Sequence, residues 1–423
     1  MDITEKILED REKKIKIINS YILEYDCLCV KANIMGTNKN IFESFFLVNY
    51  FEKIIDREIP NYELKKRIES YDGTYLLYFY KKGLYQDLKG KTILIEENNK
   101  LGRLIDLDVY YNDLGSKSRG HLRKCLICDK PAYYCNRLNN HSYQELIEAM
   151  DQMINDELVA IVRNAIDQAV ELELALPYKF GCVTLNDSGS HFDMNASVMR
   201  RAKEAIIPGL ILMFKTGLSE NNLDVIFQKI RSIGIDTERE MYLSTDGVNC
   251  YKGLIFLLGL LVSSLGYFIK NQYRDINNIF ENIKIMCRDL YKELDNSNTY
   301  GLKAYQKYKF KGARHEAISG LVNVKKGFYF CNDLSESSLQ KTLINIIVNI
   351  DDTVMLKRAQ SLDKYQEIIK KIKSINSMEE LVLVNKYCIQ ENISTGGACD
   401  ILICIIFLKL INQKINLNGE NYA

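Results

Sequence analysis

The sequence predicts a multidomain protein in which a mixed α/β domain over residues 1–157 precedes a larger all-α domain over 158–423. Three observations support this division. The length of 423 residues exceeds that of one typical domain. Short aromatic and β-branched runs alternate with glycine-containing turns between residues 25 and 120. From residue 142 onwards, almost every segment has the periodicity of amphipathic helices.

The elements of the first domain follow from local patterns. Apolar residues recur at helical spacing over residues 3–22 and predict an amphipathic helix. Two runs, TYLLYFY at 74–80 and KTILIEE at 91–97, have the aromatic and β-branched composition of strands. A long helical tract opens at residue 142, and we expect the domain boundary inside it, near residue 155.

Charge and composition exclude several classes of protein. The formal net charge is +1, from 56 basic and 55 acidic residues, which argues against a dedicated nucleic-acid-binding protein. The charged N-terminus lacks the apolar segment of a signal peptide. The twelve cysteines then indicate thiols or metal ligands in a reducing cytoplasm. The uncharged run 253–269 has lysines at both ends, so we expect a buried core helix and no membrane association.

Two aspartates in the segment RLIDLDVY, residues 103–110, form the first candidate site. If this segment is a strand, Ile105, Leu107 and Val109 face the core, while Asp106 and Asp108 share the other face. Such a pair of carboxylates can bind magnesium, which nucleotidyl transfer needs to neutralise phosphate charge. The alternative is a half-exposed strand with a solvated face. Hydroxyl and guanidinium partners for a triphosphate lie nearby in the sequence: Arg103, Ser118, Arg119 and Arg123.

A cysteine-rich segment follows this strand. Cys125, Cys128, Cys135 and His141 have the spacing C-x2-C-x6-C-x5-H. Three thiols and an imidazole suit a tetrahedral zinc site, and the first pair of cysteines carries most of this signal. The alternative is a set of small buried thiols that cluster without a metal. We take structural zinc as the hypothesis to be tested.

The loops of the predicted helical domain hold its candidate site residues. Gly396 and Gly397 precede a helix, where free backbone N–H groups bind phosphate. Arg314 and Glu316 lie in a segment rich in glycine and alanine, which lets a ligand approach the backbone. The further candidates are His191, Asp193, Glu238, Asn249, Lys252, Gly312, Asp352 and Arg358.

A simpler explanation competes for several of these residues. Helix capping accounts for Ser190, Asp193 and Ser394 without any ligand. A lone histidine such as His191 is more often a hydrogen-bonded structural residue than a catalyst, and glycines are ordinary in loops. Single residues therefore do not decide the function of this half. Their order along the chain is more informative.

Four segments of the first domain occur in a family-like order: KANIMGTNK, IEENNKLGRLIDLDV, GSKSR and RKCLICDKPAYYCNRLNNHSYQEL. With them, residues 10–155 resemble the apo-citrate lyase phosphoribosyl-dephospho-CoA transferase family, or holo-acyl-carrier-protein synthase of citrate lyase. The resemblance implies a nucleotidyltransferase-like domain that transfers phosphoribosyl-dephospho-CoA to a serine of the lyase's apo acyl-carrier subunit, releasing pyrophosphate. By analogy with other nucleotidyltransferases, Asp106 and Asp108 would bind magnesium, while Arg103 and Arg119 hold phosphates.

Six segments of the helical half also occur in a family-like order: GSHFDM, RSIGIDTEREM, TDGVNCYKGLIFLLGLL, YKFKGARHEAISG, DDTVMLKR and STGGACDILICIIFL. With them, residues 160–410 resemble the triphosphoribosyl-dephospho-CoA synthase family. The resemblance implies an all-helical domain that joins ATP to dephospho-CoA with loss of adenine. The product of that reaction is the precursor that the first domain would consume.

The helical half departs from the family pattern at four places. Tyr251 stands in NCYKG where the family has histidine, and PYKFG, DTV and STGG each differ from the family segment. The retained residues are Asn249, Lys252, Arg314, Glu316 and Asp352. These retained polar residues are sufficient for the chemistry that the resemblance implies.

The resemblance suggests roles for the helical candidates. Glu238 or Glu316 would act as the base, Asp193 and Asp352 would bind magnesium, and Lys252, Arg314 and Arg358 would hold the triphosphate. His191, Asn249, Gly312, Gly396 and Gly397 would contact the substrates. Two alternatives stay open: a non-catalytic, zinc-stabilised adaptor with a helical scaffold, and an enzyme with only one active half.

Overall fold

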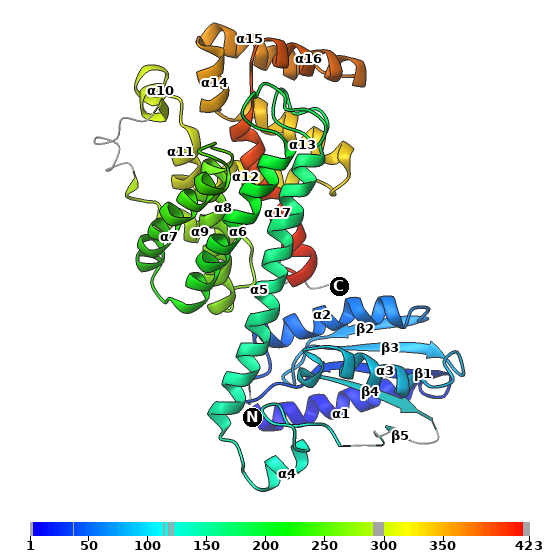
Figure 1. The fold of residues 1–423 in the computed structure, drawn as a ribbon. Helices are drawn as coiled ribbons and strands as arrows, with labels where there is room; N and C mark the ends of the chain where they lie inside the picture. The colour runs from blue at the N-terminus through cyan, green and yellow to red at the C-terminus, as the bar shows by residue number, and fades with distance from the viewer. Residues whose placement is uncertain are drawn as a thin grey trace. The chain divides into compact units, whose positions relative to one another are not determined.

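The computed structural model describes residues 3–36, 38–112, 115–116, 120, 122–290 and 300–417. The chain divides into two compact units, which we call unit 1 (Met1–Leu158 with Lys414–Ala423) and unit 2 (Val159–Gln413) (Figure 1). The division falls inside helix α5 (Tyr143–Ala175), beside the predicted boundary at 157/158. Unit 1 combines a sheet with helices, and the described part of unit 2 consists of helices and loops, in the predicted order.

Unit 1 is built on a five-stranded antiparallel sheet in the order β2-β3-β1-β4-β5. Its strands are β1 (Tyr25–Ala32), β2 (Leu64–Ile68), β3 (Tyr75–Lys81), β4 (Ile105–Tyr111) and β5 (Gly115–Ser116). The register places Asp106 of β4 opposite Lys31 of β1, and Asp108 opposite Cys29. Directly opposed residues of antiparallel strands share a face. These four side chains therefore lie on the same side of the sheet.

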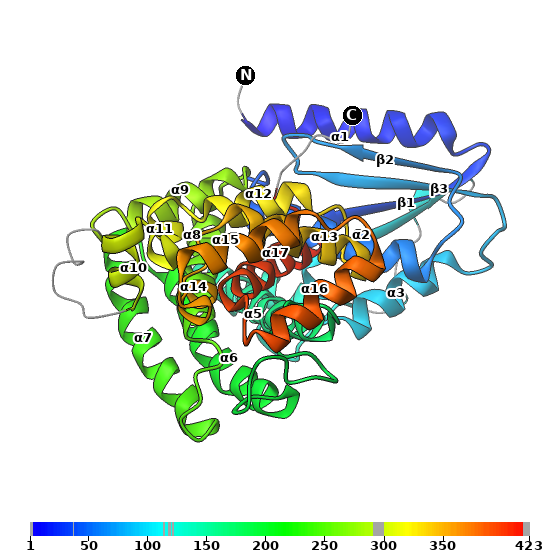
Figure 2. The same cartoon turned by 90° about the horizontal axis from the view of Figure 1, so that it is seen from above.

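Helices cover both faces of this sheet (Figure 2). α1 (Ile3–Tyr21) packs on one face, where Ile18 joins a core formed with β1 and β3. That core consists of Ile18, Cys27, Cys29, Tyr75, Leu77 and Phe79. α2 (Phe42–Glu58) and α3 (Leu88–Asn98) lie on the other side. Because Cys29 belongs to the core under α1, the face that carries Asp106 and Asp108 is the face that α1 covers.

The predicted helix over 3–22 and the predicted strand at 74–80 are confirmed, whereas the predicted strand at 91–97 is wrong. That segment lies in α3. The Asp87 side chain caps α3 by accepting from the N–H of Gly90, 2.8 Å away. Thr92 and Glu96 are both buried, and their spacing of four residues matches one helical face. Capping and packing thus override the strand propensity of the isoleucines.

Unit 2 is helical throughout the residues that the structure describes. α6 (Ala196–Ser219), α7 (Leu223–Ser244) and α8 (Lys252–Lys270) pack together, and α9 (Asn277–Met286) packs against α8. The other helices are α10 (Tyr300–Tyr308), α11 (Gly312–Ile318), α12 (Val322–Phe330), α13 (Glu336–Asn349), α14 (Thr353–Ala359), α15 (Leu362–Lys373), α16 (Met378–Gln390) and α17 (Gly396–Ile415).

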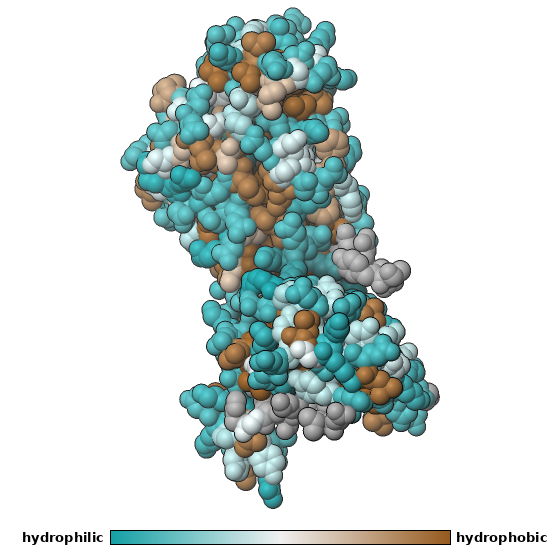
Figure 3. Space-filling model, turned by 90° about the vertical axis from the view of Figure 1, so that its right-hand side faces the viewer, coloured by the Kyte–Doolittle hydropathy of each residue, from teal (hydrophilic) through white to brown (hydrophobic). Residues whose placement is uncertain are grey.

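The predicted buried helix over 253–269 is confirmed as α8. Within the described ranges it is the one helix long and apolar enough to cross a membrane, and 78% of its apolar window is buried. Its glycines allow close packing, because a Cβ on Gly266 would collide with the carbonyl oxygen of Phe214 in α6. Hydrophilic side chains are spread over both units on the face that Figure 3 shows. Helix packing explains the composition of α8, and the cytoplasmic location stays a prediction.

Candidate active sites

Asp106 and Asp108 lie on β4, where the predicted alternation is confirmed. Ile105, Leu107 and Val109 are buried, and the two aspartates are partly exposed. Burial raises the pKa of Asp108, and the neighbouring Asp106 carboxylate raises it further. A divalent cation between the two groups would relieve this repulsion. The oxygen donors and their shared face therefore fit the predicted magnesium site.

Arg123 lies between two carboxylates of unit 1. Its Nη1 forms an ion pair with Asp106, and its Nη2 donates to Oε2 of Glu96 at 2.8 Å. The other oxygen of Glu96 accepts from the N–H of Leu107, at 2.9 Å. Glu96 is not predicted as a site residue. The sequence predicts a strand for its segment, which gives no reason for Glu96 to face β4. The buried Glu96 orients the Arg123 guanidinium beside the aspartate pair.

Arg103 belongs to a short 3-10 helix, η1 (Gly102–Leu104), rather than to the strand that follows. Its Nε and Nη1 atoms are buried and have no hydrogen-bond partner among the residues that the structure describes. Burial lowers the pKa of Arg103, and the nearby Arg123 lowers it further. Buried donors are normally paired, so an anionic group would complete this site. The predicted phosphate partners Ser118 and Arg119 lie outside the described residues.

The structure places further cationic side chains near the aspartates, and these are not among the predicted site residues. Lys31, opposite Asp106 in the sheet, forms an ion pair with Asp72. Arg11 of α1 binds the same Asp72 carboxylate through Nε and Nη2, both at 3.1 Å. Burial lowers the pKa of Lys39, and Lys31 lowers it further. The only signal for Lys31 and Lys39 in the sequence is the family-like segment KANIMGTNK that contains them.

The predicted zinc ligands lie together in unit 1. The ligand atoms of Cys125, Cys128, Cys135 and His141 are all within 4.8 Å of one another. Cys125 and Cys135 are buried, and Cys128 and His141 are partly buried. Cys135 lies on the short helix α4 (Ala132–Arg137). The four ligand atoms are therefore close enough together to surround one metal ion.

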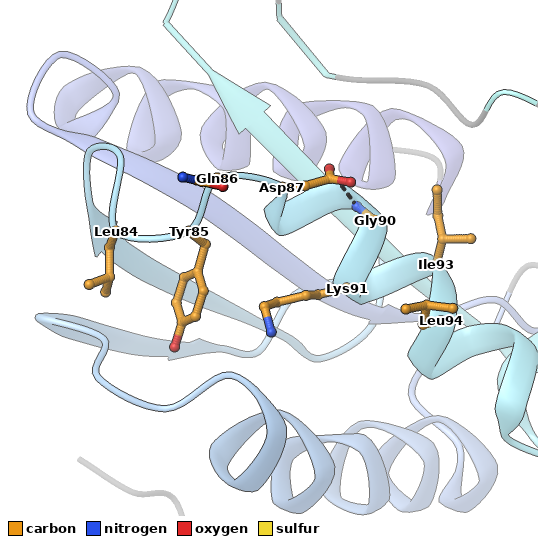
Figure 4. Close-up of a pocket in the computed structure, with 8 residues that line it drawn as sticks. All are labelled: Leu84, Tyr85, Gln86, Asp87, Gly90, Lys91, Ile93 and Leu94. Atoms are coloured by element: carbon orange, nitrogen blue, oxygen red, sulfur yellow. Dashed lines mark hydrogen bonds between the residues drawn. The ribbon is translucent and has the colours of Figure 1, made fainter.

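An open hollow of about 620 Å³ lies at the start of α3 (Figure 4). It is lined by Leu84, Tyr85, Gln86, Asp87, Gly90, Lys91, Ile93 and Leu94. None of these lining residues is a predicted site residue. Its one hydrogen-bonded pair in the figure, Asp87 with Gly90, is the cap of α3. The hollow is therefore separate from the aspartate site on β4.

In unit 2 the loop 176–195 contacts both α14 and the residues that precede α17. Nη2 of Arg358 lies 3.0 Å from Nδ1 of His191, and Nη1 of Arg358 donates to the carbonyl of Ser190 at 2.9 Å. On its other side, Nε2 of His191 lies 3.0 Å from Oγ of Ser394. Asp193 is 3.9 Å from His191. The structure thus brings together His191, Asp193 and Arg358, which the sequence singled out separately.

The capping explanation for residues of this loop is wrong. The N-cap of α6 is Asn195, whose side chain accepts from the N–H of Val198 at 3.0 Å. The hydroxyl of Ser190 instead donates to the carbonyl of Ile393, and Ser394 contacts His191. These side chains join the loop to the segment before α17. Several capping residues in succession made the helix start ambiguous in the sequence.

Asp352 occupies a fully buried position between two helices. Its Oδ1 accepts from the N–H groups of Val354 and Met355, at 2.8 and 3.0 Å, and so caps α14. Its Oδ2 accepts from the N–H of Ala398, at 3.2 Å, in the first turn of α17. A Cβ on Gly397 would lie only 3.0 Å from Oδ1. Backbone N–H groups therefore occupy both carboxylate oxygens of Asp352. These are the oxygens that would bind magnesium according to the family resemblance.

Gly312 and Gly396 both approach α14. A Cβ on Gly312 would lie 3.1 Å from Thr353, and one on Gly396 would lie 3.6 Å from Val354. Gly312 also has a φ of +53°, which favours glycine. Arg314 follows on α11 and is partly buried. Three segments that are distant in sequence therefore converge at the start of α14.

Asp400 of α17 faces the start of α8, since a Cβ on Gly253 would collide with its Oδ2. Within the described ranges the Asp400 carboxylate makes no hydrogen bond or ion pair. Burial raises its pKa well above the ordinary value, and Asp352 and Glu173 raise it further. The hydroxyl of Tyr251 is also buried and has no hydrogen-bond partner in the part of the chain described. Asp400 is missing from the predicted site.

Glu316 is engaged by backbone and side-chain donors. Its Oε1 accepts from the N–H groups of Asn323 and Val324, at 2.8 and 3.2 Å, at the start of α12. Its Oε2 accepts from Nδ2 of Asn323 at 2.7 Å. These bonds explain why a carboxylate with 4% exposure is tolerated. They leave Glu316 poorly suited to accept a proton from substrate.

The remaining candidates lie at the junction of α7 and α8. Glu238 of α7 forms an ion pair with Lys252, the first residue of α8. The side chain of Asn249 accepts from the N–H of Lys252 at 3.2 Å. The ion pair is partly exposed, so both groups are available to a bound ligand. Asn249 and Lys252 lie close to Tyr251 and Gly253 in sequence, and the ion pair brings Glu238 to the same end of α8 as Asp400.

Comparison with known proteins supports the family resemblance of both halves of the chain. A family model for ATP:dephospho-CoA triphosphoribosyl transferase matches residues 160–419, and one for apo-citrate lyase phosphoribosyl-dephospho-CoA transferase matches residues 3–157. Protein CitXG of Leuconostoc mesenteroides subsp. cremoris is 30% identical over 372 residues, covering 78% of this chain and 79% of that protein. The chain belongs to both families. The two resemblances inferred from the sequence are confirmed.

Other relatives share the same organisation or one half of it. Protein CitXG of Haemophilus influenzae is 26% identical over 446 residues, which cover 95% of each chain. A probable 2-(5''-triphosphoribosyl)-3'-dephosphocoenzyme-A synthase of Photobacterium profundum is 29% identical, covering 65% of this chain and 95% of that protein. As a member of both transferase families, the chain is a transferase of citrate lyase prosthetic-group biosynthesis. This membership argues against the non-catalytic adaptor.

Proposed function

We propose that the chain catalyses two consecutive reactions. In unit 2, a ribose hydroxyl of dephospho-CoA attacks the anomeric carbon of ATP. The bond from that carbon to adenine breaks, adenine takes up the hydroxyl proton, and triphosphoribosyl-dephospho-CoA is formed. In unit 1, a serine hydroxyl of the apo acyl-carrier subunit of citrate lyase attacks the α-phosphorus of this product. A phosphodiester forms, and pyrophosphate leaves and takes up the serine proton.

The observation that carries this proposal is the convergence of distant family segments at one end of α17. His191 contacts Ser394 just before α17, and Asp400 in α17 faces Gly253 at the start of α8. Two long helices therefore begin beside each other. The positive ends of their helix dipoles favour the negative charge of a triphosphate. Arg358 and Lys252 add positive charge at the same end of the unit.

Asp400 is the best candidate for the base of the first reaction. It is partly buried, makes no hydrogen bond or ion pair with the described residues, and has a pKa that desolvation raises. In its ionised form, a carboxylate with a raised pKa accepts a proton readily, as a general base must. Glu238 remains the alternative base. Glu316 is set aside because backbone and amide donors occupy both its oxygens.

Magnesium in unit 2 would be held by Asp193 together with phosphate oxygens of the substrate. Mg²⁺ commonly uses one or two carboxylates plus substrate phosphates. The side chain of Asp193 is 43% exposed and lies 3.9 Å from His191, so its oxygens are accessible to an ion. Bound magnesium would neutralise triphosphate charge. Asp352 is less suitable because both its oxygens accept backbone N–H groups.

In unit 1, Asp106 and Asp108 would hold magnesium against the triphosphate. Arg103 and Arg123 would contact the phosphate oxygens, since the first has unpaired buried donors and the second lies beside Asp106. Magnesium would neutralise the charge on the departing pyrophosphate. Lys31, on the same face of the sheet, adds a further positive charge. This arrangement supports attack by an incoming serine hydroxyl on the bound phosphorus.

The proposal is tested by incubating the full chain with ATP, dephospho-CoA, magnesium and the apo carrier subunit. We expect release of adenine and an intact-mass increase of the carrier equal to one phosphoribosyl-dephospho-CoA group. Asp400→Asn should stop adenine release but still modify the carrier when the precursor is supplied. Asp106→Asn should show the opposite pattern. Failure of one activity in the unaltered chain, under conditions where the other proceeds, would support the alternative of one active half.

A further inference from the structure

We propose that Cys125, Cys128, Cys135 and His141 bind one zinc ion, and that this ion fixes the position of Arg123. Sγ of Cys128 lies 3.4 Å from Sγ of Cys135 and 3.3 Å from Nε2 of His141. In a tetrahedral site with zinc–sulfur bonds of about 2.3 Å and zinc–nitrogen bonds of about 2.0 Å, ligand atoms lie roughly 3.5–3.8 Å apart. The four side chains are thus already arranged around a position that zinc fits.

The backbone of this segment is folded to present the ligands. The N–H of Cys125 donates to the carbonyl of Lys130 at 2.7 Å, and the N–H of Ala132 donates to the carbonyl of Arg123 at 2.8 Å. These bonds close a tight hairpin between the first cysteine pair and α4. The N–H of Ile127 lies 3.5 Å from Sγ of Cys125. Such an N–H group stabilises a thiolate in the second shell of a metal site.

The third cysteine is supported in the same way. Nδ2 of Asn140 lies 3.8 Å from Sγ of Cys135, and the N–H of Asn140 donates to the carbonyl of Cys135 at 3.0 Å. Asn140 precedes His141, so the same turn orients the imidazole. Cys125 and Cys135 are therefore held by hydrogen bonds within one short segment.

The donor set selects the metal and its role. Three thiolates and an imidazole are preferred by zinc, whereas magnesium prefers oxygen donors. Four protein ligands complete a tetrahedral shell and leave no position for substrate, which indicates a structural ion. All twelve cysteines are free, and the 3.4 Å between Cys128 and Cys135 exceeds a disulfide bond of about 2.0 Å. Zinc binding releases the thiol protons and leaves one net negative charge, which basic residues of the segment offset.

The hairpin connects this site to the aspartates of β4. The backbone carbonyl of Arg123 accepts a hydrogen bond that closes the hairpin. The side chain of Arg123 binds Asp106 and Glu96. Without the metal, the short segment from Arg123 to His141 has few apolar contacts to keep it folded. Arg123 would then lose its fixed backbone position. This second part rests on the proposed function of unit 1, whereas zinc binding itself does not.

Elemental analysis of the purified full chain tests the metal site directly. We expect about one zinc per chain, and its replacement by cobalt should give the visible absorption of tetrahedral thiolate-bound Co²⁺. Cys128→Ser should lose the zinc on dialysis against a chelator. Cys250→Ser, which changes a partly buried thiol in unit 2, should keep it. A folded wild-type chain without zinc after supplementation, or a Cys128→Ser variant that keeps a full equivalent, would overturn the proposal.

Limited proteolysis tests the link to Arg123 without depending on activity. Chelation should increase tryptic cleavage after Arg123, Lys124 and Arg137 in the wild-type chain, and cleavage in unit 2 should not change. With magnesium restored, the zinc-depleted chain should lose carrier modification from supplied precursor and retain adenine release. Unchanged cleavage and transfer after zinc removal would overturn the positioning of Arg123. Absence of transfer in the zinc-loaded chain would instead count against the proposed function of unit 1.

Discussion

Nη2 of Arg358 lies 3.0 Å from Nδ1 of His191, and this contact determines which ring nitrogen carries the proton. Arginine can only donate, so Nδ1 must accept. The proton of the neutral imidazole is then on Nε2, which lies 3.0 Å from Oγ of Ser394. Burial lowers the pKa of His191 to about 4, with a further contribution from the Arg358 charge. His191 is thus a neutral link between the loop and the segment before α17.

We predict that His191 stays neutral until the pH falls to about 4. Its unfolded pKa is about 6.5, so the unfolded chain binds this proton first. The corresponding stability is fully present above pH 6.5 and is lost as the pH falls towards 4. A ¹H–¹³C NMR titration of the imidazole measures this directly. The chain has only four histidines, so the signal missing in His191→Gln identifies the residue.

The control for the His191 titration is Arg358→Met, which removes the neighbouring charge and keeps much of the side-chain volume. The pKa of His191 should then rise towards its ordinary value. A wild-type signal that already titrates near pH 6.5 would show that the imidazole is not held as described.

Arg103→Met should separate binding from stability. The substitution removes buried donors that have no partner among the described residues, so the melting temperature should be unchanged or higher. Loss of a charge-assisted hydrogen bond to phosphate costs about 1.5–3 kcal/mol, so kcat/KM for carrier modification should fall roughly tenfold to hundredfold. Arg57→Met, at an exposed site on α2, serves as the control. A large loss of stability in Arg103→Met would indicate a structural role instead.

Asp106→Asn and Asp108→Asn should each reduce carrier modification by on the order of a hundredfold or more, because the metal loses a charged ligand. Adenine release should be unaffected. Glu97→Gln changes an exposed carboxylate on α3 and should leave both rates unchanged. Near wild-type transfer from supplied precursor in either aspartate variant would contradict the assignment of the magnesium site.

Glu316 and Asp400 should respond to substitution in opposite ways. Glu316→Ala leaves the N–H groups of Asn323 and Val324 without acceptors, which costs about 1–3 kcal/mol of stability. Turnover of the folded fraction should persist. Asp400→Asn should keep or raise stability, since it removes a partly buried carboxyl whose charge is unfavourably desolvated, yet abolish adenine release. Thermal melting together with a chromatographic adenine assay distinguishes the two, and equal losses of both properties would argue against these roles.

Tyr251→His restores the residue found in the family, and we expect adenine release to be unchanged or modestly faster. The Tyr251 hydroxyl is buried and unpaired in the described part of the chain, so its removal does not break a protein hydrogen bond. Tyr251→Phe is the matched control for the hydroxyl alone. If Phe reduces turnover without lowering the melting temperature, the hydroxyl contacts substrate and the tyrosine has replaced the histidine functionally.

The sequence predicts features that depend on local periodicity. The two aspartates of β4 alternate with buried Ile105 and Leu107, and this pattern is visible without the fold. Glu96 could not be found in the same way, because its helix resembles a strand in composition. The buried carboxylate of Asp352 accepts a hydrogen bond from the N–H of Ala398, which lies far along the chain. No local pattern reveals such a partner, so the sequence alone does not distinguish a capping carboxylate from a metal ligand.

Asp352 joins α14 and α17 mechanically, because one carboxylate accepts backbone hydrogen bonds from the first turn of each helix. Rotation of either helix would break bonds in the other, so the two move together as a rigid body. The loop 176–195 is attached to this body by separate side-chain contacts through Ser190 and His191. Each of these contacts can break without disturbing a helix. Under the proposed reaction, we therefore expect substrate entry and adenine departure to require displacement of this loop, while the starts of α14 and α17 stay in place.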